Sequence, residues 1–261
     1  EYFLTADYFS IRRAIEYLSK DLHDFLFQTT QKWTAPEINQ EVFTFLDQTK
    51  DRPFFMFINY FDAHDPYTLG AENLPLFTKE QRDFNEIYWL IYDIVSSQDR
   101  YKVQTMPDET LAYIKALYDS GIRYLDENLG VLLDGLKARG LSDNTLVILV
   151  GDHGEEFLEH GGLLHLQTLY EEVLTIPLVI YYPKVLAPVR VDSQVGILDV
   201  FPSILELAGL KVPEGLKARS FVQALKGLGK FDRDYFLAER LGREGEYESA
   251  VEAFYREGWK R

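Results

Sequence analysis

The chain contains no cysteine among its 261 residues. Disulfide bonds, zinc–thiolate sites and a cysteine nucleophile are therefore excluded within this sequence. Long apolar runs are also absent, since none approaches the roughly 18 residues that a membrane-spanning helix requires. We expect a soluble protein. Its compartment stays open, because a lack of cysteine is compatible with the cytoplasm and does not exclude the periplasm.

Positive charge is scarce. The sequence has 27 lysines and arginines against 42 aspartates and glutamates, which gives a formal net charge of -15. Such a surface would repel nucleic acid phosphates and an anionic membrane, so neither is expected as a partner. The charge says less about small ligands, because a bound metal can invert the field inside a site. The oligomeric state is left open.

Helical periodicity alternates with short apolar runs along the chain. Apolar residues recur every three or four positions in residues 6–31 and 105–139, and Thr34 to Glu37 form a capping box that predicts another helix. The apolar runs at residues 54–61 and 146–150 have the length and composition of strands buried on both faces of a parallel sheet.

This alternation predicts an α/β fold in which helices cover both faces of a largely parallel sheet. We expect residues 1–227 to form this core. After about Gly227 the pattern loosens and charges become frequent. Residues 228–261 are therefore predicted to be the start of a small C-terminal subdomain.

Asp152 and His153 come directly after the apolar run at residues 146–150. One carboxylate oxygen and one imidazole nitrogen suit a divalent cation when further carboxylates join them. An isolated Asp-His pair more often forms a turn with a local cap. The preceding strand, the flanking glycines and the histidines downstream favour a metal site here.

Two more histidines are candidates for catalysis. His64 follows the apolar run at residues 54–61, and parallel strands would place it at the same sheet edge as His153. His165 could bind an anion as imidazolium or protonate a leaving oxygen. A single loop histidine is usually solvated. His160 could equally serve only to orient its loop, and the pairs Glu155-Glu156 and Glu171-Glu172 are expected on solvated surfaces.

Five segments resemble motifs of the sulfatase family, a branch of the alkaline phosphatase-like superfamily. They occur in the family's order and at natural spacing between residues 53 and 209. The segments are PFFMF (53–57) with HDPY (64–67), IRYLDE (122–127) with Gly130, GDHGE (151–155), His165 with YEE (170–172) and IPL (176–178), and DVFPS (199–203) with LAG (207–209).

The resemblance implies a three-layer alkaline phosphatase-like α/β sandwich and metal-dependent hydrolysis of a small anionic sulfuric ester. Asp152 and His153 match the family's second pair of metal ligands, so a divalent cation is expected, calcium first and manganese or magnesium next. His64 matches the histidine that holds the sulfate or protonates the leaving group. His165 matches the lysine or histidine that contacts the sulfate, although Leu166 stands where the family usually has glycine.

Other family features are missing from this sequence. There is no amino-terminal strand with two metal-binding aspartates, and no C/S-x-P/A-x-R motif whose first residue becomes the formylglycine nucleophile. We therefore expect a carboxyl-terminal portion of a sulfatase that is inactive by itself. Two alternatives stay open: a phosphodiesterase, phosphonate hydrolase or phospho-group transferase of the same superfamily, or a non-catalytic binding module. The specific substrate is not readable from these residues.

Overall fold

The computed structural model describes residues 33–49, 52–97, 103–165, 168–233, 235–240, 251–256 and 259–260. The helix expected at residues 6–31 lies outside this description. The helical elements are α3 (Ala35–Thr49), η1 (Ala71–Leu76), α4 (Phe84–Ser97), α6 (Asp108–Ala138), η2 (Ser142–Asn144), α7 (Glu171–Leu174), η3 (Ile197–Asp199), α8 (Val200–Leu207) and α9 (Val222–Leu225). The strands are β1 (Val147–Val150), β2 (Glu156–Phe157), β3 (Leu163–Leu164), β4 (Leu178–Tyr181), β5 (Phe236–Arg240), β6 (Val251–Arg256) and β7 (Trp259–Lys260).

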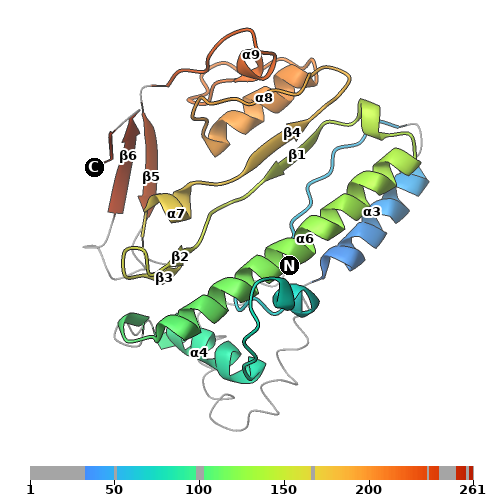
Figure 1. Ribbon diagram of the computed structural model, residues 1–261. Helices are drawn as coiled ribbons and strands as arrows, with labels where there is room; N and C mark the ends of the chain where they lie inside the picture. Colours follow the sequence, from blue (N-terminus) through green and yellow to red (C-terminus); the bar gives the residue numbers. More distant parts are fainter. Residues whose placement is uncertain are drawn as a thin grey trace, which may run out of the picture.

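Helix α6 is the long helix on which both apolar clusters of the fold are built (Figure 1). Its 31 residues are unbroken, and Pro107 occupies the N-cap position. The helix ends in a Schellman motif, because Gly140 adopts a positive φ of 68° and the Leu141 N–H bonds the Leu136 carbonyl oxygen at 3.0 Å. Within the helix, Gly121 allows α6 to pack closely against Asp62, since a Cβ at position 121 would lie 3.3 Å from the Asp62 carbonyl oxygen.

Two apolar clusters use opposite halves of α6. In the first, the amino-terminal half packs with α4 and the β2–β3 hairpin through buried residues that include Ile87, Ile91, Ile114 and Leu117. In the second, the carboxyl-terminal half packs with α3, and Val147 of β1 joins that cluster. Burial of these faces is the main source of stability, because it removes apolar area from water.

The three layers predicted for the fold are visible in Figure 1, where α3 and α6 lie on one side of the β1–β4 pair and α8 lies on the other. The predicted α/β class is confirmed. The expected parallel direction is wrong for this pair, since β1 and β4 run antiparallel with Val150 opposite Leu178. Residues 151–177 connect the end of β1 to the start of β4, and these two points lie at the same end of the strand pair. The described residues of this connection form the β2–β3 hairpin and the four-residue α7, and none of these elements carries the chain back along the sheet.

Residues 53–61 are extended, but they have no ladder partner among the described residues. Exposure alternates along them: Phe54 and Met56 pack on the second cluster, whereas Phe55 and Phe57 are 81% and 83% exposed. The prediction of a strand buried on both faces is therefore wrong for this part of the chain. Its apolar composition reflects one face packed on the helices and one face left open.

Asp62 ends this extended segment and ties it to α3. Its side chain is buried, and its Oδ1 accepts the N–H of Ala35, the first residue of the helix, at 2.8 Å. The capping box predicted at Thr34 is present on the glutamate side, with the Thr34 N–H bonded to Glu37 Oε2 at 2.8 Å. No hydrogen bond reaches Asp62 Oδ2 from the described residues. Burial raises the pKa of Asp62 above its ordinary value.

The last described strands, β5, β6 and β7, form an antiparallel sheet. They fall within residues 228–261, and the boundary proposed at residues 227 and 228 stays a prediction. A bilayer-crossing helix, one both long and apolar enough, was not found in the described part of the chain.

We predict that Ile114→Ala destabilises the protein strongly. Ile114 is fully buried where α6 meets α4, so the change leaves a cavity, and the free energy of unfolding should fall by about 2–5 kcal/mol. Val131→Ala, at a 53% exposed position of the same helix, is the matched control, with an expected change within about 0.5 kcal/mol. Urea unfolding measures both. Equal effects of the two substitutions would contradict this account of the core.

Asp62→Asn should change how stability depends on pH. Because the pKa of Asp62 is higher in the folded than in the unfolded chain, the folded state keeps its proton while the unfolded state loses it. Wild-type stability from this group is therefore full below the unfolded pKa and declines as pH rises through the folded pKa. The unfolding free energy of the variant relative to wild type should therefore increase as pH rises above about 4, the ordinary pKa of an aspartate. A difference that is constant with pH would contradict the assignment.

Candidate functional site

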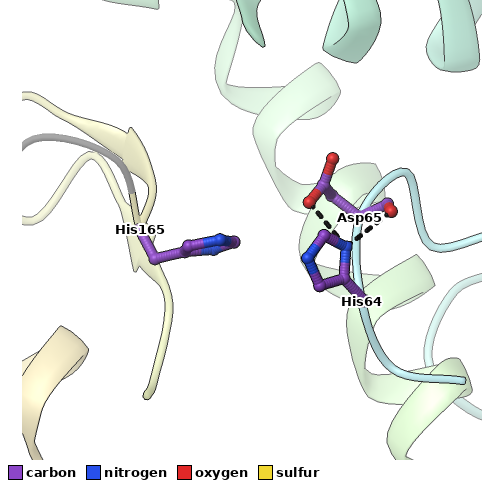
Figure 2. Close-up of side chains that lie close together, drawn as sticks. All are labelled: His64, Asp65 and His165. Atoms are coloured by element: carbon purple, nitrogen blue, oxygen red, sulfur yellow. Dashed lines mark hydrogen bonds and ion pairs between the residues drawn. The ribbon is translucent and has the colours of Figure 1, made fainter. Parts of the chain in front are cut away.

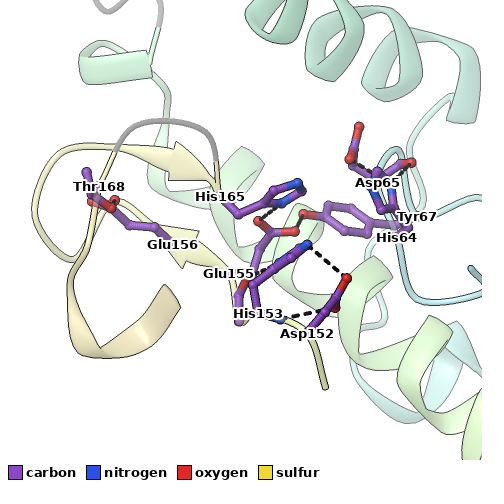
Figure 3. A network of polar contacts seen from close by, with 10 residues as sticks. His64, Asp65, Tyr67, Asp152, His153, Glu155, Glu156, His165 and Thr168 are labelled. Atoms are coloured by element: carbon purple, nitrogen blue, oxygen red, sulfur yellow. Dashed lines mark hydrogen bonds and ion pairs between the residues drawn. The ribbon is translucent and has the colours of Figure 1, made fainter. Parts of the chain in front are cut away.

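Three histidines from two distant segments meet at one place (Figure 3). The rings of His153 and His165 stack with centroids 3.9 Å apart, and the His64 ring lies 5.4 Å from the His165 ring. The sequence predicted that His64 and His153 would share one edge of the fold. The structure brings them together with Asp152 and His165.

Asp152 and His153 occupy the turn that follows β1. Asp152 is bound to the turn through Oδ1, which accepts the His153 backbone N–H at 3.0 Å. Its side chain is 87% exposed, and Oδ2 lies 3.7 Å from His153 Nε2. His153 Nδ1 lies 2.9 Å from the Gly154 carbonyl oxygen, so this nitrogen is engaged locally. Asp152 Oδ2 and His153 Nε2 are the two donor atoms of this turn that the contacts with its backbone leave out.

His64 lies in a tight turn at the end of the extended segment. The turn is closed by hydrogen bonds from the His64 N–H to the Phe61 carbonyl oxygen and from the Tyr67 N–H to the His64 carbonyl oxygen, each 3.1 Å long. His64 Nδ1 lies 2.9 Å from the Asp65 carbonyl oxygen and 2.8 Å from its Oδ1. Figure 2 shows the other ring nitrogen of His64 on the side that faces His165.

Glu155 contacts His165 through its carboxylate. The sequence did not identify Glu155 as a site residue. Glu155 is buried, its Oε1 lies 2.9 Å from His165 Nδ1, and its Oε2 accepts the Tyr67 hydroxyl at 2.7 Å. The expectation that Glu155 and Glu156 form a solvated pair is wrong, since both are buried. Hydropathy could not reveal this. The only available signal was the position of Glu155 inside the GDHGE segment.

Two glycines make room for the buried carboxylates. A Cβ at Gly154 would collide with the carbonyl oxygen of Glu172, and the Gly154 N–H bonds the Val173 carbonyl oxygen at 2.7 Å. A Cβ at Gly162 would lie 2.6 Å from Glu156 Oε2. At Gly154 only glycine permits the approach without displacing the backbone, so the site loop is held closely against α7, whereas at Gly162 the Glu156 side chain would have to move.

Glu156 and His160 build a separate cluster in the hairpin. Glu156 accepts the Gly162 N–H at 2.8 Å and the Thr168 hydroxyl at 2.6 Å. His160 Nδ1 lies 2.5 Å from Glu172 Oε1, and its ring stacks on Tyr170 at 3.7 Å. These contacts fit the alternative in which His160 orients its loop, and Glu172 is its ion-pair partner.

A hollow of about 380 Å³ borders the site, and His153 and Glu155 are among its lining residues. Lys115 is the one lysine or arginine among its lining residues and pairs with Glu159 at 3.1 Å. Burial raises the pKa of Asp119 in the same lining. Carboxylates outnumber the single lysine in this lining, so the hollow itself would repel an anion. An anion is better accommodated beside the rings of His64 and His165. The lining comprises Lys115, Tyr118, Asp119, His153, Gly154, Glu155, Phe157, Glu159, Glu172, Thr175 and Pro177.

Several solved structures share this fold. The phosphonate monoester hydrolase of Agrobacterium radiobacter aligns with a TM-score of 0.68 at 22% identity, over 87% of this chain and 52% of that one. The putative sulfatase yidJ from Bacteroides fragilis also aligns with a TM-score of 0.68, at 17% identity, over 86% of this chain and 48% of that one. Identities this low support the fold alone.

Curated relatives are sulfatases. The uncharacterized sulfatase YidJ of Escherichia coli is 27% identical over 211 residues, covering 78% of this chain and 41% of the relative. The N-acetylglucosamine-6-O-sulfatase of Bacteroides thetaiotaomicron is 33% identical over 119 residues, covering 45% and 21%. Arylsulfatase K of Bos taurus is 28% identical over 143 residues, covering 55% and 26%. The chain thus spans less than half the length of each of these relatives.

The sulfatase family model matches residues 17–210, which is well over half of the sequence. All five motif segments named above lie within this range, as do His64, Asp152, His153 and His165. This protein therefore belongs to the sulfatase family.

Proposed function

We propose that this chain supplies the histidine side of an active site for metal-dependent hydrolysis of a small anionic sulfuric ester. The observation that carries the proposal is the convergence of His64, His153 and His165 beside Asp152 in a chain of the sulfatase family. Imidazole rings that gather at one point suit an anionic group, because each can donate a hydrogen bond or a proton.

Asp152 and His153 are the proposed ligands of a divalent cation. Asp152 Oδ2 and His153 Nε2 are 3.7 Å apart, a separation that one cation can bridge, since ligand distances are about 2.0–2.6 Å. The mixed oxygen and nitrogen donors fit calcium, manganese or magnesium once further carboxylates join them. Such a cation would stabilise the negative charge that develops on the sulfuryl oxygens.

His64 and His165 are proposed to contact the sulfate group and its leaving oxygen. In both rings, Nδ1 lies against an oxygen acceptor, so Nε2 is the nitrogen directed to the ligand side. Hydrolysis breaks the bond between sulfur and the ester oxygen, and that oxygen must take up a proton. An imidazolium on either histidine can deliver it, as general acid catalysis requires.

The nucleophile of this reaction is not among the residues of this sequence. The chain has no cysteine and no S-x-P-x-R or S-x-A-x-R segment. We therefore propose that the isolated chain binds the anion without turning the ester over. Formylglycine as the nucleophile, and calcium as the metal, follow from the family resemblance.

Sulfate added to the full chain should shift the ring NMR signals of His64 and His165 in a saturable way, because both face the anion position. His160 serves as the internal control, since its Nδ1 is held by Glu172 and its signals should stay in place. No turnover of 4-nitrophenyl sulfate is expected in the same sample. Absence of the shifts would overturn the proposed anion site, and turnover abolished by Asp152→Ala would overturn the proposed inactivity. Tighter binding of methylphosphonate than of sulfate would favour the phosphonate hydrolase alternative.

Manganese should locate the proposed cation site. Mn²⁺ titrated into the chain is expected to broaden the amide signals of Asp152 and His153 first, and Asp152→Asn should remove this effect. Asp126→Asn, at a 73% exposed carboxylate of α6, is the matched control and should leave the broadening intact. Broadening that persists in Asp152→Asn would support the non-catalytic alternative instead.

A further inference from the structure

Glu155 is a buried carboxylate at the centre of the histidine cluster. Its side chain is only 5% exposed. Burying a charge is unfavourable unless the charge is paired and hydrogen-bonded. Both oxygens of Glu155 meet this condition, because Oε1 faces His165 Nδ1 at 2.9 Å and Oε2 faces the Tyr67 hydroxyl at 2.7 Å. Figure 3 shows the carboxylate between the two rings.

The chemistry of a carboxylate decides which neighbour carries each proton. A carboxylate only accepts hydrogen bonds, so both of its partners must donate. Tyr67 can do so, since burial and the nearby charge of Glu155 raise the pKa of its phenol and keep the proton in place. His165 must then carry a proton on Nδ1. In the neutral ring, Nε2 is left with the lone pair.

Hydrogen bonds also hold the backbone of Glu155 in place. The Glu155 N–H bonds the Glu172 carbonyl oxygen at 3.0 Å, and the neighbouring Gly154 N–H bonds Val173. Tyr67 is 1% exposed and packs in the first apolar cluster against Phe157. Glu155 is thus held at its Oε2 by a core residue and at its backbone by α7.

We infer that Glu155 is a positioning residue that sets the tautomer of His165, with Tyr67 holding the second oxygen of the carboxylate. Glu155 keeps one proton on His165 Nδ1, so Nε2 is the nitrogen that carries the second proton in the imidazolium form and donates it to the anionic group proposed above. This inference rests on the proposed function for the identity of that group. The tautomer itself can be measured whether or not an ester is hydrolysed.

A carboxylate-to-amide change is the sharpest probe of such a role. In the serine protease triad the same change leaves the geometry intact and lowers kcat about ten-thousand-fold, because the histidine adopts the wrong tautomer. Glu155→Gln preserves the size of the side chain. Its amide oxygen can accept from Tyr67 while its NH₂ group donates to His165 Nδ1, which forces the proton onto Nε2.

The test is long-range ¹H–¹⁵N correlation of the histidine rings in the full, labelled chain at about pH 8, above the ordinary histidine pKa of about 6.5. His165→Gln assigns the signals. In wild type, Nδ1 of His165 should appear at the shift of a protonated nitrogen and Nε2 at the shift of an unprotonated one. In Glu155→Gln the two positions should exchange. Tyr67→Phe should keep the wild-type pattern, because the carboxylate still faces Nδ1.

Glu171→Gln is the matched control, since this exposed residue of α7 lies outside the contact, and it should leave the His165 signals in place. A wild-type His165 protonated at Nε2 overturns the inference without any variant. Exchange that fails in a folded Glu155→Gln protein overturns it as well. Failure of sulfate to shift the wild-type signals, with the tautomer as expected, would overturn the proposed function and leave the role of Glu155 standing.

Discussion

The buried carboxylate of Glu155 joins the two halves of the site, and the arrangement of the histidines depends on it. Its two hydrogen bonds link Tyr67, in the turn that follows the extended segment, to His165, directly after β3. The segments are far apart in the chain, since 88 residues separate Tyr67 from Glu155. A charge in this position must be matched on both oxygens, so the carboxylate specifies one relative placement of the two loops.

The rest of the fold supports that placement. Helix α6 carries both apolar clusters, and Tyr67 and the β2–β3 hairpin belong to the first of them. Asp62 connects the His64 turn to the start of α3, while Gly154 lets the site loop approach α7. Packing therefore places the loops near one another, and the polar contacts select the orientation of the side chains within them.

Local patterns in the sequence predicted much of this correctly. The helices α3 and α6 and the strand β1 lie where periodicity, capping residues and an apolar run placed them. The meeting of His64 and His153 was also anticipated, from their positions after apolar runs, whereas a place for His165 in the same site followed from the motif resemblance. Their roles in catalysis, and the metal assigned to Asp152, stay predictions.

The sequence by itself thus determined where several helices and strands form and which residue types could make a site. Both follow from local patterns, because helix periodicity, capping and apolar runs involve residues only a few positions apart. Only the tertiary structure decided which strands pair, in which direction, and which side chains are buried. It set β1 antiparallel to β4, left Phe55 and Phe57 exposed, and buried Glu155 and Asp62. The physical reason is that strand direction and the burial of a charge depend on partners distant in the chain, which no local pattern encodes.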